Sequence, residues 1–336
     1  MSGGEATCAR CGASGVPADR FCESCGAVLA AVRRVSVPSV TQDEPSACAD
    51  CADGSYVGGY CSVCGQRRPE PDRDRANLGA IVLVTDRGLH HPRNEDAAAA
   101  GIVACEAGEA IAVAVCDGVS SSSDADTAAK AASAAGVSAM LTSLVASAKP
   151  ESAVLAGLAD AAQAAAAAGR DSLARDIAPS CTYSAVAVAP TSAGRTEIAV
   201  GNVGDSRIYW IPDPPTHARC LTVDDSVAQE LITAGAAAES EVVQAGAHTL
   251  TRWLGADADA TPWSESSARP ITLSEPGVLL VCSDGLWNYL PAADDIAAIC
   301  SGQDSAAAAV ALVDYALNAG GQDNITVALI PIGGHP

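Results

Sequence analysis

The stretch AIAVAVCDGVS, residues 110–120, places an unbroken apolar run directly before an aspartate and a glycine. The stretch GVLLVCSDGLW, residues 277–287, has the same form. Short apolar runs bounded by Gly and Asp are typical of strands. Strands that lie side by side can bring their ends to one edge of a sheet, where carboxylates such as Asp117 and Asp284 repel one another unless a cation lies among them. The two stretches therefore predict a sheet with an acidic edge.

Two further apolar runs also have an aspartate close to one end. Asp205 follows the apolar run 197–203, and Asp323 stands just before the run 325–332. Carboxylate oxygens are the ligands that Mg2+ and Mn2+ prefer, and two such ions can activate a water for hydrolysis. The four aspartates therefore favour a two-metal hydrolase, although any single Asp-Gly is most often a turn.

Two long alanine-rich stretches without proline, together with a third near the C-terminus, predict helices. Strands before the first two helices and strands after them predict a layered α+β fold rather than a strictly alternating parallel sheet. The predicted helices span 124–147, 151–169 and 305–318, and further strands are predicted at 80–85 and 182–189.

Composition narrows the classes of function. The chain has 336 residues, enough for roughly two domains. Its net charge of −21 argues against binding to nucleic acid or to anionic membranes, because both are polyanions. Its apolar runs fall short of the roughly 20 residues that span a bilayer, and its N-terminus lacks the pattern of a secretory signal. We expect a cytoplasmic protein.

Eight of the 14 cysteines form two quartets near the N-terminus. In each quartet two C-x2-C pairs are separated by a short spacer, so two turns can direct four thiolates at one tetrahedral zinc ion. A disulfide framework is the alternative, but it needs an oxidising compartment. The pattern resembles a double zinc ribbon with two structural Zn2+ ions, ligated by Cys8, Cys11, Cys22 and Cys25 and by Cys48, Cys51, Cys61 and Cys64.

A change in composition near residue 76 separates these quartets from the rest of the chain. Up to that point the sequence has 8 basic and 10 acidic residues, whereas 11 basic and 30 acidic residues follow. Two proline-containing polar stretches read as solvated linkers. The predicted organisation is zinc ribbon 1 at 1–30, a linker at 31–45, zinc ribbon 2 at 46–66, a linker at 67–76 and one large domain at 77–332.

Seven motifs of the large domain resemble, in order, the metal-dependent PPM-type protein phosphatases, the 2C class. The resemblance implies two antiparallel sheets packed face to face, flanked by helices, with the metal ions at one edge. It covers residues 77–332, and its specificity comes from the order of the motifs rather than from any single one. The motifs are GLHHPRNEDA (88–97), VCDGVS (115–120), GNVGDSRIYW (201–210), LTVDDS (221–226), LTRWLGAD (250–257), LVCSDGLW (280–287) and GGQDNITVAL (320–329).

The resemblance also implies roles for individual residues. Two Mn2+ or Mg2+ ions would activate a water that hydrolyses phosphoserine or phosphothreonine in proteins. Asp205 would help to hold a third ion, and Glu95 and Asp96 would orient water behind the metal ligands. The implied ligands of the two ions are Asp117, the carbonyl of Gly118, Asp284 and Asp323, and the implied catalytic residues are Asp117, Asp284, Asp323 and Glu95.

Three departures from the family pattern concern substrate binding and general acid catalysis. His91 stands where the family has an arginine for the substrate phosphate, and Arg93 or Arg87 could take over that task. The glycine-rich DGxGG is DGVSS here, and Val119 replaces a histidine that some relatives use as a general acid.

The metal aspartates are all present, which favours an active enzyme whose partners are phosphoproteins, a Ser/Thr protein kinase and its targets. The alternative is a non-catalytic phosphatase-like adapter that binds partners through its zinc ribbons. We expect His248 and the other remaining histidines to be surface or packing residues, and Trp287 to belong to the core.

Overall fold

The computed structural model describes most of the large domain and parts of the N-terminal region. The first predicted zinc quartet lies outside the described residues. These are 6–7, 14–15, 24, 32–39, 48, 51, 53–57, 60–66, 72–105, 107–122, 124–168, 178–193, 195–215, 217–259, 261–264 and 267–333.

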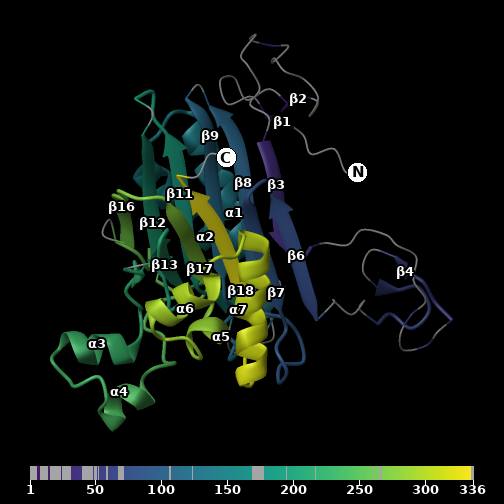
Figure 1. Ribbon diagram of the computed structural model, residues 1–336. Coiled ribbons are helices and arrows are strands. Elements are labelled where there is room, and N and C mark those ends of the chain that lie inside the picture. Colours follow the sequence, from purple (N-terminus) through teal and green to yellow (C-terminus); the bar gives the residue numbers. More distant parts are fainter. Residues whose placement is uncertain are drawn as a thin grey trace.

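Two six-stranded antiparallel sheets pack face to face (Figure 1). One sheet has the order β16 (Ala268–Ile271), β12 (Thr196–Val203), β11 (Tyr183–Pro190), β9 (Gly108–Cys116), β8 (Ala97–Cys105) and β3 (Val32–Val37). The other has the order β14 (Arg219–Cys220), β13 (Arg207–Pro212), β17 (Gly277–Cys282), β18 (Ile325–Ile332), β7 (Ile81–Asp86) and β6 (Arg73–Leu78). The predicted α+β sandwich of antiparallel sheets is confirmed.

Helices cover both outer faces of the sandwich (Figure 1). The predicted helices are confirmed as α1 (Ala125–Val145), α2 (Pro150–Ala168) and α7 (Ser305–Ala319). The shorter helices are α3 (Val227–Thr233), α4 (Glu241–Ala245), α5 (Asp284–Trp287) and α6 (Ala293–Cys300). The remaining strands form two-stranded pairs, namely β1 (Ala6–Thr7) with β2 (Ser14–Gly15), β4 (Tyr56–Val57) with β5 (Tyr60–Cys61), and β10 (Ser180–Cys181) with β15 (Leu254–Gly255).

Strand β9 illustrates how the layers are built from the sequence. Successive side chains of a strand point to opposite faces of the sheet. In β9 the small residues Ala110, Ala112 and Ala114 face the core under α1 and α2, whereas Val113 and Val115 face the second sheet. Alanine on the helix side lets the helices lie close to the strands, so a scarcity of aromatic residues is compatible with a buried core.

Helix α1 is, among the described helices of at least 18 residues, the one apolar enough by length and composition to cross a membrane. It packs on β8 and β9, and 50% of its most apolar window is buried within the fold. A core helix of a sandwich passes the same test.

The two predicted linkers contribute edge strands instead. β3 pairs with β8 in one sheet, from Val32 opposite Val103 to Val37 opposite Ala98. β6 pairs with β7 in the other sheet along its whole length. The prediction of solvated linkers was wrong at these positions because charged side chains on an edge strand point to solvent while the alternate residues, such as Leu78, pack inward. The second cysteine quartet thus lies on the connection between the edges of two different sheets.

Tyr183 gives a test of packing under the helices. Its ring is fully buried, and its hydroxyl has no hydrogen-bond partner among the described residues. A Cβ at Gly136 of α1 would lie 2.2 Å from that hydroxyl.

We expect Tyr183→Phe to raise the free energy of unfolding by about 1 kcal/mol, because a buried hydroxyl without a partner carries its desolvation cost uncompensated. Urea unfolding measures the change. The matched control is Tyr209→Phe, which should lower stability, because the Tyr209 hydroxyl accepts a hydrogen bond from Arg207. Loss of stability in Tyr183→Phe would show that the hydroxyl is satisfied in solution.

Candidate active site

Four aspartates from the ends of strands line one cleft of about 880 Å3. Asp117 follows β9, and Asp205 lies on the turn between β12 and β13. Asp284 begins α5 directly after β17, and Asp323 stands two residues before β18. The strands come from both sheets, so the cleft lies at the edge of the sandwich where the two sheets meet. The structure thus places the sequence-predicted metal aspartates around one space.

Burial and mutual repulsion disfavour the charged state of these groups. Burial, followed by the carboxylates of Asp96 and Asp284, holds the pKa of Asp117 well above its ordinary value. Burial and Asp284 likewise raise the pKa of Asp205 to about 8 and raise the pKa of Asp323. Groups of this kind are stabilised by a positive charge placed among them.

The donor set fits hard divalent cations. One buried carboxylate oxygen, Oδ1 of Asp284, has no hydrogen-bond partner among the described residues. Carboxylates and a backbone carbonyl at Gly118 are the ligands that Mg2+ and Mn2+ take. The carboxylate oxygens are spread around the cleft. In the described part of the chain, no three of them all lie within 4.8 Å of one another.

Backbone contacts fix the position of Asp117. Its N–H donates to Thr182 Oγ1 at 3.0 Å, and its carbonyl accepts from the N–H of Thr182 at 2.8 Å. The hydroxyl of Thr182 also lies 2.7 Å from that of Ser206, next to Asp205. A Cβ at Gly118 would lie 2.6 Å from the carbonyl oxygen of Glu95, so only glycine fits there. The Asp-Gly pair is therefore required by packing as well as by chemistry.

The acidic pair expected behind the metal ligands borders this site. Asp96 is buried and accepts a hydrogen bond from the Ser283 hydroxyl at 2.8 Å, while burial raises its pKa to about 7. The N–H of Glu95 donates to Asn324 Oδ1 at 2.7 Å, and burial raises the pKa of the Glu95 carboxyl. Asn324, to which the sequence assigned no role, follows Asp323 directly and thus ties the residues before β18 to the acidic pair.

The three candidates for the substrate phosphate lie in different settings. His91 Nε2 is 3.2 Å from Oδ1 of Asp323, one of the predicted metal ligands. Arg93 lies 3.5 Å from Glu95 and faces two further carboxylates on α1 and its N-cap. Arg87 is paired with Asp72 at 2.8 Å and also donates to the carbonyl of His91. The described residues that line the cleft include none of these three candidates, and no other arginine or lysine.

His248, which the sequence predicted to be a surface or packing residue, lines the cleft. Its Nδ1 lies 3.7 Å from Asp284 Oδ2, and this carboxylate raises the pKa of the imidazole. Its ring stacks on Trp287 with the planes 12° apart. The sole sequence signal was its place two residues before the motif LTRWLGAD. Trp287 is buried, as predicted, but its indole N–H also donates to the carbonyl of Asp205.

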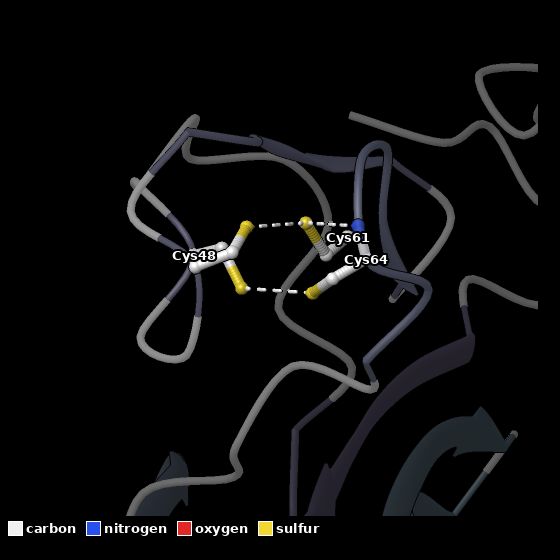
Figure 2. Close-up of side chains that lie close together, drawn as sticks. Cys48, Cys61 and Cys64 are labelled. Atoms are coloured by element: carbon white, nitrogen blue, oxygen red, sulfur yellow. Dashed lines mark hydrogen bonds between the residues drawn. The ribbon is translucent and has the colours of Figure 1, made fainter.

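The second cysteine quartet forms a separate cluster (Figure 2). The sulfur atoms of Cys48 and Cys64 are 3.6 Å apart, as are those of Cys51 and Cys61, and all four lie within 4.8 Å of one another. Four sulfurs at about 2.3 Å from a tetrahedral zinc ion have separations of this size. Backbone N–H groups that donate to the Cys61 sulfur lower the pKa of its thiol, which favours the ligating thiolate.

Comparisons with known proteins agree with this geometry. The Protein phosphatase 2C family matches residues 90–314, which is more than half of the chain. The chain belongs to the protein phosphatase 2C family. This membership accounts for the sandwich and for the order of the seven motifs.

Three relatives of this 2C-family chain illustrate its range of similarity. The serine/threonine phosphatase stp of Listeria innocua is 30% identical over 137 residues, which are 40% of this chain and 52% of the relative. The chain thus spans about half the length of the curated relatives it matches. The PPM Ser-Thr phosphatase MsPP of Mycobacterium smegmatis, solved with cacodylate, is 27% identical to this chain with a TM-score of 0.55. The match covers 77% of this chain and 100% of the MsPP chain. The catalytic domain of the phosphatase PstP, solved with 2 manganese ions, is 23% identical with a TM-score of 0.50 and covers 76% and 96%.

Proposed function

We propose that this chain is a metal-dependent protein phosphatase that hydrolyses phosphoserine and phosphothreonine. The observation that carries the proposal is the convergence of four strand-end aspartates on one cleft, with a buried carboxylate oxygen left unpartnered. Asp117, Asp284 and Asp323, with the carbonyl of Gly118, would hold two Mn2+ or Mg2+ ions. Asp205 would contribute to a third ion. When bound, these ions supply Lewis acidity and activate water for attack on phosphorus.

The residues of the chain itself position the reactants. Thr182 and Ser206 hold the two turns that carry Asp117 and Asp205. Glu95, whose pKa is raised by burial, would accept a hydrogen bond from water at the proposed metal ligands. Preorganised groups of this kind stabilise the charge that develops in phosphoryl transfer.

We propose that the second quartet holds one structural Zn2+ and that the first quartet holds another. The close spacing of the sulfur atoms supports the zinc ion at the second quartet (Figure 2). Four protein ligands leave no open position, so the ions stabilise small modules rather than catalyse a reaction. The proposed partners are phosphoprotein substrates, among them a Ser/Thr protein kinase and its targets, and the proposed location is the cytoplasm.

The test is hydrolysis of p-nitrophenyl phosphate and of a phosphothreonine peptide by the full-length chain. Activity should disappear in EDTA, return with Mn2+ and be lost in Asp323→Asn. A folded, Mn2+-loaded protein that hydrolyses neither substrate would overturn the enzyme proposal and would favour the non-catalytic adapter. Metal analysis after reducing purification should find about two zinc ions per chain.

We propose that His91 binds the substrate phosphate, because its imidazole lies 3.2 Å from Asp323, one of the proposed metal ligands, whereas Arg93 is paired with Glu95 and Arg87 with Asp72. We expect His91→Arg to lower the Michaelis constant for a phosphopeptide by about threefold to tenfold, because a guanidinium is a permanent cation with two parallel donors. Steady-state kinetics measure this, with kcat expected to change by less than about twofold. A large rise of the Michaelis constant in Arg93→Gln, with no change in His91→Arg, would assign the phosphate to Arg93 instead.

A further inference from the structure

The segment 226–250, which carries α3 and α4, leaves the sandwich and returns to it at one point (Figure 1). At its base the N–H of Val227 donates to the carbonyl of Thr249, and the N–H of Thr251 donates to the carbonyl of Asp225, each at 2.9 Å. Few side chains of this segment are buried, and Ala228 and Val243 are among them. A segment with so few buried contacts can move as a unit about its base.

Asp225, at that base, also holds the turn that carries Asp205. Its N–H donates to the carbonyl of Gly204 at 2.9 Å, and its Oδ2 accepts from the N–H of Gly204 at 3.1 Å. Its other oxygen, Oδ1, accepts from Arg252 at 2.9 Å. One carboxylate therefore joins the residue before Asp205 to an arginine on the returning leg, residues 248–253, which leads from the segment back to β15.

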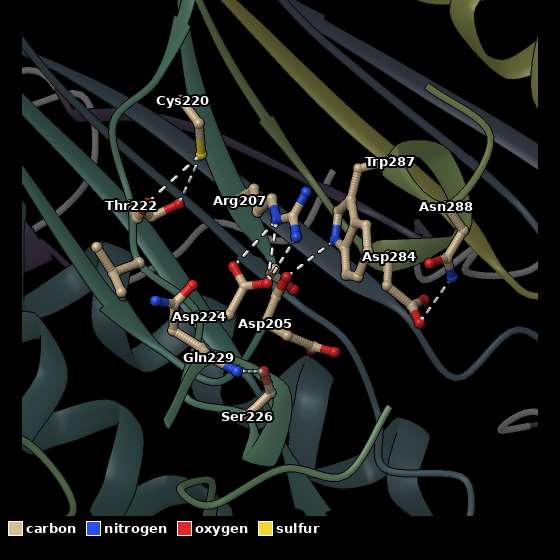
Figure 3. A network of polar contacts seen from close by, with 12 residues as sticks. Asp205, Arg207, Cys220, Thr222, Asp224, Ser226, Gln229, Asp284, Trp287 and Asn288 are labelled. Atoms are coloured by element: carbon tan, nitrogen blue, oxygen red, sulfur yellow. Dashed lines mark hydrogen bonds and ion pairs between the residues drawn. The ribbon is translucent and has the colours of Figure 1, made fainter. Parts of the chain in front are cut away.

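A second set of contacts reaches Asp205 through Trp287 and Arg207 (Figure 3). The indole N–H of Trp287 donates to the carbonyl of Asp205 at 2.9 Å. The guanidinium of Arg207 lies 3.6 Å from the centre of the Trp287 ring and is paired with Asp224 at 2.7 Å. Asp224 and Asp225 are neighbours, so the base of the segment grips the Asp205 turn through both routes.

The returning leg is also a wall of the cleft. Residues on both sides of Arg252 line it, from His248 and Leu250 to Trp253. A substrate that fills the cleft would contact this leg, which is joined to the residue before Asp205 through Arg252 and Asp225.

We propose that Asp225 is a positioning residue that couples occupation of the cleft by the substrate to the metal affinity of Asp205. The proposal rests on the proposed phosphatase function and adds a means of regulating the same site. Phosphate in the cleft steadies the returning leg, which fixes the Asp205 turn. Because coupling between two bound ligands is reciprocal, a metal ion at Asp205 strengthens phosphate binding by the same factor.

The test measures Mn2+ binding to the full-length chain by calorimetry, with and without inorganic phosphate, and the exchange rate of the Gly204 amide. Wild type should bind its weakest Mn2+ more tightly with phosphate. Arg252→Gln should weaken that Mn2+ by about threefold to tenfold and abolish the effect of phosphate, since it breaks a half-exposed charged hydrogen bond. The matched control is Arg195→Gln, an exposed arginine on the turn between β11 and β12, at the far end of the sheet, which should behave as wild type.

Two variants of Asp225 separate positioning from simple stability. Asp225→Ala should speed exchange of the Gly204 amide and weaken the last Mn2+, whereas Asp225→Asn, which keeps an acceptor, should restore the slow exchange. Unchanged Mn2+ binding in Asp225→Ala despite fast Gly204 exchange would overturn the proposal, as would identical phosphate effects in Arg252→Gln and Arg195→Gln. Binding is measured without turnover, so a failure of the phosphatase proposal appears separately, as a Mn2+-loaded wild type that does not hydrolyse p-nitrophenyl phosphate.

Discussion

Asp117→Asn should remove catalysis and at the same time stabilise the metal-free protein. With Mn2+ present we expect kcat/KM for p-nitrophenyl phosphate to fall by about 1000-fold or more, since a neutral amide is a poorer ligand for a divalent cation than the carboxylate that it replaces. In EDTA we expect the free energy of unfolding to rise by about 1–2 kcal/mol, because the substitution removes one charge from a buried set of like charges. The two changes have opposite signs and the same cause.

The pH dependence follows from the direction of the pKa shifts. The pKa values of Asp117, Asp205 and Asp96 are raised in the folded chain, the last two to about 8 and about 7. A raised carboxyl pKa contributes stability that is present below the unfolded value and is lost as pH rises through the folded value. In EDTA the melting temperature should therefore fall between about pH 4 and pH 8, and Asp117→Asn should flatten the fall.

Thermal unfolding across this pH range, with and without Mn2+, measures the effect. The control is Asp160→Asn on the exposed face of α2. This substitution removes a solvent-exposed charge and should leave the dependence of the melting temperature on pH unchanged. A metal-free Asp117→Asn protein that is less stable than wild type would contradict the repulsion described for the cleft.

The acidic edge could be predicted from the sequence because its signals are local. An apolar run that stops at Asp117 or Asp284 is a strand with its end marked. The alanine-rich helices could be predicted equally well, because α1 has no proline and α2 has one only at its first position, Pro150, each over about five turns. In each case the residues that define the element are neighbours in the chain.

Other parts of the fold depend on residues that are far apart in the sequence. β8 begins with four alanines, which favour helix, yet it is a strand because β9 and β3 pair with it on both sides. β3 and β6 read as linkers because an edge strand shows its charges to solvent. His248 carries no motif, and it reaches Asp284 only because the segment 226–250 folds back onto the cleft.

The edge strands lead to the second large effect, on a truncated chain. Removing residues 1–76 deletes all of β3 and most of β6, and so leaves β8 and β7 as open edges. It also removes Arg73, which pairs with Asp86 and with Asp314 of α7 at 2.8 Å each. We expect this chain to lose about 4 kcal/mol or more of stability and to aggregate, because unpaired edges are templates for pairing with other copies.

Two matched chains show whether the strands or the zinc modules are responsible. Removing residues 1–30 keeps both strands and should leave the melting temperature within about 3 °C of the full chain. Cys48→Ser with Cys61→Ser breaks the second quartet but also keeps both strands, so it should lose zinc and retain hydrolysis of p-nitrophenyl phosphate. Size-exclusion chromatography and thermal unfolding compare the three. A chain 77–336 that is monomeric and as stable as the full protein would mean that β3 and β6 are dispensable, and the linkers predicted from their composition would then describe the molecule better than the paired edges do.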